Sequence, residues 1–147
     1  MTEGAHPDTI PGVLRAAAER WPDTPALRDG EAAWTFAELW SDATRFAGGL
    51  HASGVGPGDR IAIWAPNSGP WVVAALGVAC AGAVLVPVNT RAKGREAADM
   101  IGRARCRALL TVSGFLGTDY VGMLRDAGGV PSLRETVILA GDPPDGT

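Results

Sequence analysis

Residues 59–89 constrain the fold of this chain more than any other stretch. The sequence predicts an apolar strand at 61–64, a long apolar helix at 71–81 and a second apolar strand at 84–88. Two such strands joined by a helix form a βαβ unit, whose strands pair in parallel and are buried on both faces. The helix is apolar almost all round, which predicts that it is buried too. Its Ala and Gly residues would let neighbouring elements approach closely.

Strands and helices also alternate along the rest of the chain. Thr35 and Glu38 form a capping box at a helix start, and Gly54 fits the left-handed cap at the end of that helix. The other predicted helices are residues 10–21, 36–50, 90–105 and 118–127, and the other predicted strands are 25–28, 33–34, 107–112 and 135–139. This order predicts an α/β fold with a mainly parallel sheet flanked by helices.

The domain limits follow from composition. We expect a disordered N-terminus at 1–8, one partial domain at 9–140 and a flexible tail at 141–147. The start has no cationic and apolar leader, and Gly82 and Pro87 interrupt the one long apolar run, so neither a signal peptide nor a membrane span is predicted. Cys80 and Cys106 form no CxxC pair and are predicted to be buried thiols in a cytoplasmic protein.

Glycine-rich stretches are the candidates for a phosphate-binding loop, which needs close backbone approach and usually a lysine. Residues 54–59 fail the dinucleotide-binding spacing, because Asp59 occupies the position of the third glycine. Residues 49–54 have the glycine spacing of a P-loop, but Val55 follows where the lysine should stand. Both stretches are therefore predicted to be turns.

Six cations between residues 91 and 107 are a candidate anion-binding surface. With Glu96 and Asp99 the region carries a charge of about +4 at neutral pH. Such a surface would attract a nucleotide or a CoA phosphate, and an ordinary solvated helix face is the alternative. The six residues are Arg91, Lys93, Arg95, Arg103, Arg105 and Arg107.

The histidines and tryptophans give weaker indications of a functional site than the basic cluster does. His6 and His51 have no neighbours at metal-ligand spacing, so neither a metal site nor a Ser/His/Asp triad is predicted. Trp64 and Trp71 flank the loop 66–68 at the carboxyl end of a predicted strand, where open α/β sheets commonly bind ligands. Core packing is the alternative interpretation of both indoles.

Four segments in order carry a resemblance to a known family. They are T-I-P-x-V-L-R-x-A-A-E-R-x-P-D-x-P-A-L at 9–27, T-F-A-E-L at 35–39, G-V-x-P-G-D-R-I-A-I-W-x-P-N-S at 54–68 and A-G-A-V-L-V-P-V-N-T-R at 81–91. Over about residues 9–140 the chain resembles the amino-terminal region of AMP-forming acyl-CoA ligases, which belong to the adenylate-forming superfamily. E-A-A-D-M-I at 96–101 and G-F-L-G-T-D-Y at 114–120 are most similar to actinobacterial ligases of fatty acids or steroid-derived carboxylates.

The resemblance implies an enzyme that joins a small-molecule carboxylate to CoA, as in fatty acid metabolism, with ATP, CoA and Mg²⁺ as its cofactors. It also implies that the phosphate loop ending in Pro-Lys-Gly and the catalytic lysine follow later than the matched segment. Lys93 does not match that lysine in context. No residue of this chain is therefore assigned a catalytic, cofactor-binding or metal-binding role, and the chain alone is expected to be inactive.

Two alternatives stay open at this point. The chain could instead be a non-catalytic interaction module, or a remnant that docks on a full-length paralogue. A small dinucleotide-binding domain is disfavoured by the failed glycine spacing. The net charge of −3 argues against nucleic acid as a partner. A partial parallel sheet would also leave an exposed edge, which predicts marginal stability and self-association.

Overall fold

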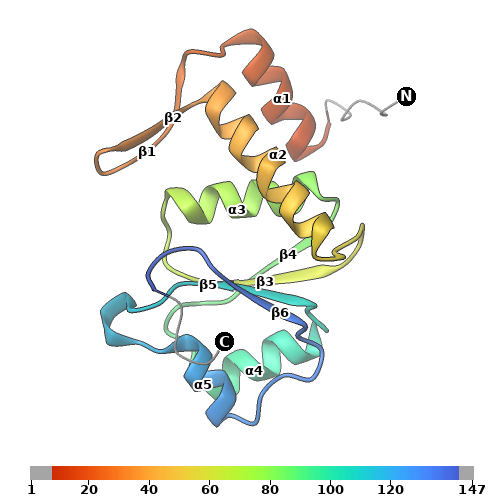
Figure 1. Cartoon of the computed structure of the whole chain (residues 1–147), viewed down its shortest axis with the longest axis vertical. Helices are drawn as coiled ribbons and strands as arrows, with labels where there is room; N and C mark the ends of the chain where they lie inside the picture. Colours follow the sequence, from red (N-terminus) through yellow and green to blue (C-terminus); the bar gives the residue numbers. More distant parts are fainter. Residues whose placement is uncertain (1–7, 143–147) are drawn as a thin grey trace. The chain divides into compact units, whose positions relative to one another are not determined.

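The computed structural model describes residues 8–142 and has the predicted α/β architecture, with each predicted helix and strand present (Figure 1). The largest shift of a boundary is at α4, which begins at Gly94 rather than at residue 90. The helices are α1 (Ile10–Arg20), α2 (Phe36–Ala52), α3 (Gly69–Cys80), α4 (Gly94–Arg103) and α5 (Tyr120–Asp126), with a 3₁₀ turn η1 (Phe115–Gly117) before α5. The strands are β1 (Pro25–Asp29), β2 (Ala32–Thr35), β3 (Arg60–Trp64), β4 (Val84–Pro87), β5 (Ala108–Thr111) and β6 (Glu135–Ile138).

The chain divides into two units. Unit 1 comprises the residues up to Pro57 together with Ser68–Ala83, and unit 2 comprises Gly58–Asn67 together with the residues from Val84. The predicted disordered N-terminus and flexible tail lie almost wholly in residues 1–7 and 143–147, outside the described part of the chain. Those domain limits stay predictions.

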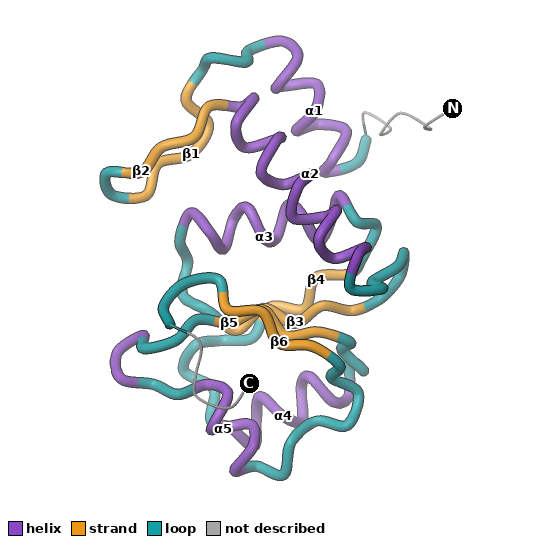
Figure 2. Tube along the Cα trace, viewed as in Figure 1, coloured by secondary structure: helices purple, strands orange, loops and turns teal. Residues whose placement is uncertain are grey.

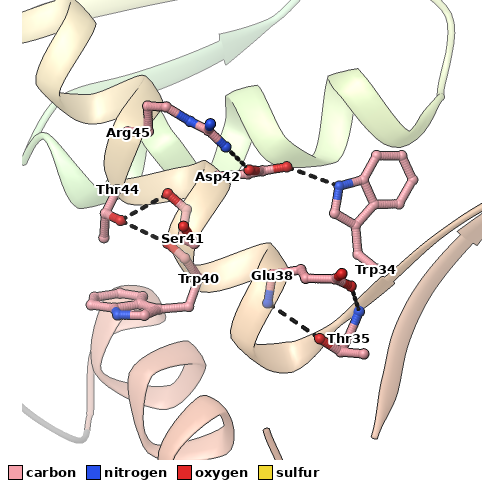
Figure 3. Close-up of polar contacts among 8 residues, drawn as sticks. All are labelled: Trp34, Thr35, Glu38, Trp40, Ser41, Asp42, Thr44 and Arg45. Carbon is pink, nitrogen blue, oxygen red and sulfur yellow. Dashed lines mark hydrogen bonds and ion pairs between the residues drawn. The ribbon is translucent and has the colours of Figure 1, made fainter. Parts of the chain in front are cut away.

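Unit 1 consists of α1, α2 and α3 with the antiparallel hairpin β1–β2. The capping box of α2 is confirmed: Glu38 N donates to Thr35 Oγ1 at 3.3 Å, and Thr35 N donates to a Glu38 carboxylate oxygen at 2.8 Å (Figure 3). At the other end Gly54 has φ +80°, and Val55 N donates to Leu50 O at 2.9 Å. These contacts form a Schellman motif, and they confirm the left-handed cap predicted at Gly54.

The core of unit 1 lies between its helices. Gly77 of α3 lies against α2, since a Cβ at this position would be 2.7 Å from Cδ1 of Phe46. The close approach predicted from the small residues of α3 is therefore confirmed at Gly77. Trp21, which follows α1, is 50% exposed. One cluster of this core consists of Leu14, Leu39 and Ala43, with half-buried Ala26, Leu27, Trp34, Phe36, Trp40, Val72, Val73, Leu76 and Cys80 around them.

Unit 2 holds the parallel sheet, in the order β4-β3-β5-β6. β3 pairs in parallel with both β4 and β5, and β5 pairs in parallel with β6. Residues 61–64 of β3 and all of β5 are buried. The prediction that both strands of the βαβ unit are buried on both faces is wrong for β4, where Val84 is 47% exposed. Val84 is exposed because β4 is an edge strand with one neighbour in the described sheet.

Helices α4 and α5 lie side by side on one face of this sheet (Figures 1 and 2). Ala97 and Ile101 of α4 and Leu124 of α5 are buried. The two helices meet closely at Gly94, where a Cβ would be 2.4 Å from the carbonyl oxygen of Met123. The helix predicted at residues 90–105 is confirmed, over the shorter span Gly94–Arg103.

Candidate functional site

The carboxyl ends of the parallel strands of unit 2 meet at one edge of the sheet, where open α/β sheets commonly bind ligands. Three hydrogen bonds organise this edge. Thr111 Oγ1 donates to Trp64 O at 2.8 Å, Trp64 Nε1 donates to Asn89 O at 2.9 Å, and the Tyr120 hydroxyl donates to Thr90 O at 3.5 Å. The segments that follow β3, β4 and β5 are thereby held to one another.

Trp64 is part of the core at this edge. Its side chain is 0% exposed, and its ring centroid is 4.5 Å from that of Tyr120. The core-packing interpretation of Trp64 therefore holds, since a buried indole cannot contact a ligand. Trp71 belongs to unit 1, where it is half-buried, and its backbone N–H donates to Ser68 Oγ at 3.2 Å to cap α3.

A hollow of about 180 Å³ opens beside the same edge, between the loop that follows β5 and the end of β6. The loop is anchored to the segment after β6, because Ser113 N donates to Ala140 O at 2.9 Å. The hollow is lined by Val112, Ser113, Gly114, Gly117, Thr118, Asp119, Val121 and Ile138.

The chemistry of this hollow does not suit a phosphate. None of its lining residues is a cation, and Asp119 places a carboxylate on the wall. That carboxylate already accepts the backbone N–H of Gly122 at 2.8 Å as the cap of α5. The remaining polar groups are the hydroxyls of Ser113 and Thr118, which can hold a small neutral polar group.

The loop over this hollow carries backbone strain. Leu116 has φ +50° and is 86% exposed, between Gly114 and Gly117, which also have positive φ. A left-handed conformation costs a non-glycine residue about 1–2 kcal/mol. This strained residue exposes an apolar side chain to solvent, although Leu116 is not among the residues that line the hollow.

The predicted basic cluster is divided by the fold. Arg91 and Lys93 follow β4 at the carboxyl edge of the sheet, whereas Arg105 and Arg107 precede β5 at the opposite edge. The ten-residue helix α4 separates the two groups by about 15 Å. Arg103 is 3.7 Å from a carboxylate oxygen of Asp99 on the same helix. The six cations therefore do not form one anion-binding surface.

Arg60 has a role that sequence reasoning missed. Its guanidinium donates to Ala104 O at 2.9 Å, to Arg105 O at 3.0 Å and to Gly58 O at 3.2 Å. Ala104 is the C-cap of α4, and Arg105 has φ +51°. Arg60 thus satisfies carbonyl groups at the end of α4. The only local signal was a cation at the start of a buried strand.

The glycine-rich stretch 54–59 and the histidines are not brought into a site. Gly54 closes the carboxyl end of α2, where the helix dipole opposes a phosphate. Asp59 belongs to unit 2, where its carboxylate is 3.8 Å from Arg107 Nε. These residues do not fit a triphosphate. His51 lies 3.2 Å through Nε2 from Ala81 O, and His6 lies outside the described residues.

Burial raises the pKa of the Cys80 thiol, and at Cys106 burial also raises the pKa although Arg60 acts against it.

In residues 8–142, no group of three or more His, Cys, Asp or Glu side chains could hold a metal ion. Within the same residues, no helix combines the length and apolarity needed to cross a membrane.

The family model of the AMP-binding enzymes matches residues 14–147, and the chain belongs to that family.

Individual relatives agree. The chain is 41% identical over 145 residues to a 3-[(3aS,4S,7aS)-7a-methyl-1,5-dioxo-octahydro-1H-inden-4-yl]propanoyl:CoA ligase of Rhodococcus jostii, covering 97% of this chain and 28% of the relative. The solved N-terminal domain of FACL13 from Mycobacterium tuberculosis is 26% identical with a TM-score of 0.82, over 91% of this chain and 33% of that one. The anthranilate CoA ligase AuaEII shares the fold, with a TM-score of 0.84 at 23% identity over 94% of this chain and 26% of that one. The chain thus spans about a quarter to a third of the length of these proteins.

Proposed function

We propose that this chain supplies the amino-terminal scaffold of an ATP-dependent carboxylate–CoA ligase. The complete enzyme converts a carboxylate, ATP and CoA into an acyl-CoA, AMP and pyrophosphate, and Mg²⁺ accompanies the ATP. The observation that carries this proposal is the 41% identity to a CoA ligase over 97% of the chain, within a family match that spans residues 14–147.

The proposal assigns no residue of this chain to ATP, CoA or Mg²⁺. The 147 residues contain no Pro-Lys-Gly sequence and one lysine, Lys93. Phosphoryl chemistry needs a donor-rich loop and cations around the phosphates. We therefore expect the chain by itself to bind these cofactors weakly and to release no pyrophosphate.

The proposed substrate is a hydrophobic carboxylic acid, either a fatty acid or an acid with fused rings. Support comes from the name of the Rhodococcus relative, whose acyl group is a propanoyl chain on an octahydroindene ring system. We place the enzyme in the cytoplasm, a location supported by the free cysteines Cys80 and Cys106.

A chimera tests the function. This chain replaces the matching segment of the Rhodococcus ligase, and pyrophosphate release and acyl-CoA formation are measured with that enzyme's acid and with fatty acids. We expect an active chimera, because the replaced segment is a scaffold of closely similar sequence. The 147-residue chain alone, assayed in parallel, should release no pyrophosphate above the blank without carboxylate.

Two results would contradict the proposal. Carboxylate-dependent pyrophosphate release by the chain alone would show that residues of this chain bind ATP and support adenylation. A chimera that folds with the parent's melting temperature but forms no acyl-CoA would show that the segment is not interchangeable with that of a ligase.

The interaction-module function remains the second candidate because β4 presents an exposed edge with Val84 in solvent. Such an edge can pair with a strand of another chain, such as a full-length paralogue. A pull-down of the Rhodococcus ligase by this chain, lost on changing Val84 to Lys, would favour this function. An active chimera without that binding would exclude it.

A further inference from the structure

A second pocket of about 370 Å³ lies within unit 1, at the place where α1, α2 and the end of α3 meet. The wall from α2 is a single stripe of the helix, at positions 40, 44, 47, 48 and 51, which follow helical spacing. Pro11 and Arg15 of α1 are also four residues apart and so share one face. Cys80, the last residue of α3, completes the lining. The volume falls in the range of small-molecule sites, about 300–1,000 Å³.

The lining has an apolar interior and one cation, Arg15, at its rim. Trp40, Ala47 and Cys80 supply the apolar surface. His51 also lines the pocket, with its Nε2 3.2 Å from Ala81 O. Figure 3 shows the Trp40 indole standing off α2 beside α1. No Asp or Glu is among the lining residues. An occupant with a flat apolar body and one negative charge matches this lining.

Arg15 keeps donors for such an anion. Its Nε donates to Glu19 Oε1 at 2.8 Å, on the exposed surface of α1. The terminal amino groups of its guanidinium have no partner among residues 8–142. A carboxylate could therefore bind these groups while the ion pair with Glu19 stays in place.

Gly48 adds no side chain to the α2 wall of the pocket. It lies inside α2, where glycine costs about 0.5–1 kcal/mol relative to alanine. A Cβ at this position would meet nothing within 4 Å, so the packing of the protein does not require glycine here. A larger side chain at this position would therefore extend into the open space beside the α2 wall.

We propose that this pocket, which we name the α1–α2–α3 pocket, binds a small aromatic carboxylate. The site is separate from the sheet edge of unit 2 and does not depend on the ligase function proposed above. The ring occupies the space over Gly48 and against Trp40, and the carboxylate accepts hydrogen bonds from Arg15 at the rim.

Cys80 provides the test, because it lines the pocket while Cys106 is 0% exposed in unit 2 and serves as an internal control. Alkylation of the full 147-residue chain by iodoacetamide is followed by peptide mass spectrometry, with benzoate as the probe and benzamide as its neutral counterpart. Benzoate at ten times its Kd should slow alkylation of Cys80 about tenfold, because only free protein reacts. Benzamide should protect much less, and the rate at Cys106 should not change.

Substitutions at the lining residues test whether the probe binds in this pocket. Gly48→Leu should fill the pocket and abolish protection by benzoate, whereas Gly49→Leu, on a neighbouring but different face of α2 and also without a neighbour within 4 Å, should keep it. Gly48→Ala serves if Gly48→Leu does not fold. Arg15→Gln should weaken benzoate about threefold, the size expected for an exposed charge pair.

Other outcomes overturn the proposal. Equal protection by benzoate and benzamide would reduce the site to an apolar cavity without anion recognition. Protection that survives Gly48→Leu, or that appears equally at Cys106, would place the probe elsewhere. Amide chemical-shift changes on adding benzoate, read for Gly48 and His51, give a measurement that does not depend on thiol chemistry, and their absence would also overturn it.

Discussion

At the scale of single residues, Arg60 has the clearest structural role. It donates to two carbonyl groups at the end of α4, those of Ala104 and Arg105. Lysine cannot reproduce this fork of donors. We predict that Arg60→Lys lowers the free energy of unfolding by about 1–2 kcal/mol, within the range for hydrogen bonds to charged groups. Urea denaturation measures it, with Arg95→Lys on the exposed surface of α4 as a control that should change little.

A second prediction at this scale concerns alkaline pH. Burial raises the pKa of Cys80 and Cys106 above the ordinary value of 9.0 and that of Tyr120 above 10.0. Below pH 9.0 both the folded and unfolded states keep these protons, so the contribution is constant. Above it the unfolded state loses protons first, and the free energy of unfolding falls as pH rises toward the folded-state values. Melting temperatures on either side of pH 9.0 should show this fall, and Cys106→Ala should make it shallower; an unchanged slope would argue against burial as its cause.

At the scale of elements, replacing Gly77 by alanine at the contact between α2 and α3 has two effects on stability of opposite sign. Alanine favours a helix by about 0.8–1 kcal/mol over glycine. However, a Cβ at Gly77 would lie 2.7 Å from Cδ1 of Phe46 and 3.1 Å from Ala43 O, and such overpacking costs about 1–3 kcal/mol. We predict that Gly77→Ala is net destabilising, while Gly49→Ala, with open space around it, stabilises. Thermal melts of both variants measure the sign of each change in stability. Stabilisation by Gly77→Ala would mean that the two helices can move apart.

The elements themselves were predictable because their signals are local. Thr35 with Glu38, and Gly54 after a helical stripe, fix both ends of α2 within a few residues of sequence. The exposed position of β4 was not predictable, since β3 and β4 are equally apolar and only the pairing of β5 with β3 makes β4 an edge. The sites were also not predictable, because they depend on contacts between residues far apart in sequence. The two acceptors of Arg60 at the end of α4 are 44 and 45 residues away in sequence, and the pocket of unit 1 joins three separate helices.

At the scale of the whole molecule, the exposed sheet edge predicts association. β4 ends the described sheet, and Val84 places an apolar side chain in solvent on that edge. Natural edge strands are commonly blunted by a lysine, which a neighbouring strand cannot bury. We predict that the chain associates as its concentration rises and that Val84→Lys shifts it toward the monomer, measured by sedimentation velocity.

The matched control for this last prediction is Leu116→Lys. It introduces the same charge at an exposed apolar side chain, but in the η1 turn rather than on a sheet edge. If association runs through β4, Val84→Lys should reduce it and Leu116→Lys should leave it nearly unchanged. Equal effects of the two variants would point to net charge, which moves from −3 to −2 in both, as the cause. A wild-type chain that is monomeric at every concentration, with a sharp cooperative melt, would contradict edge pairing altogether, because the unpaired backbone groups of β4 would then be satisfied by water alone.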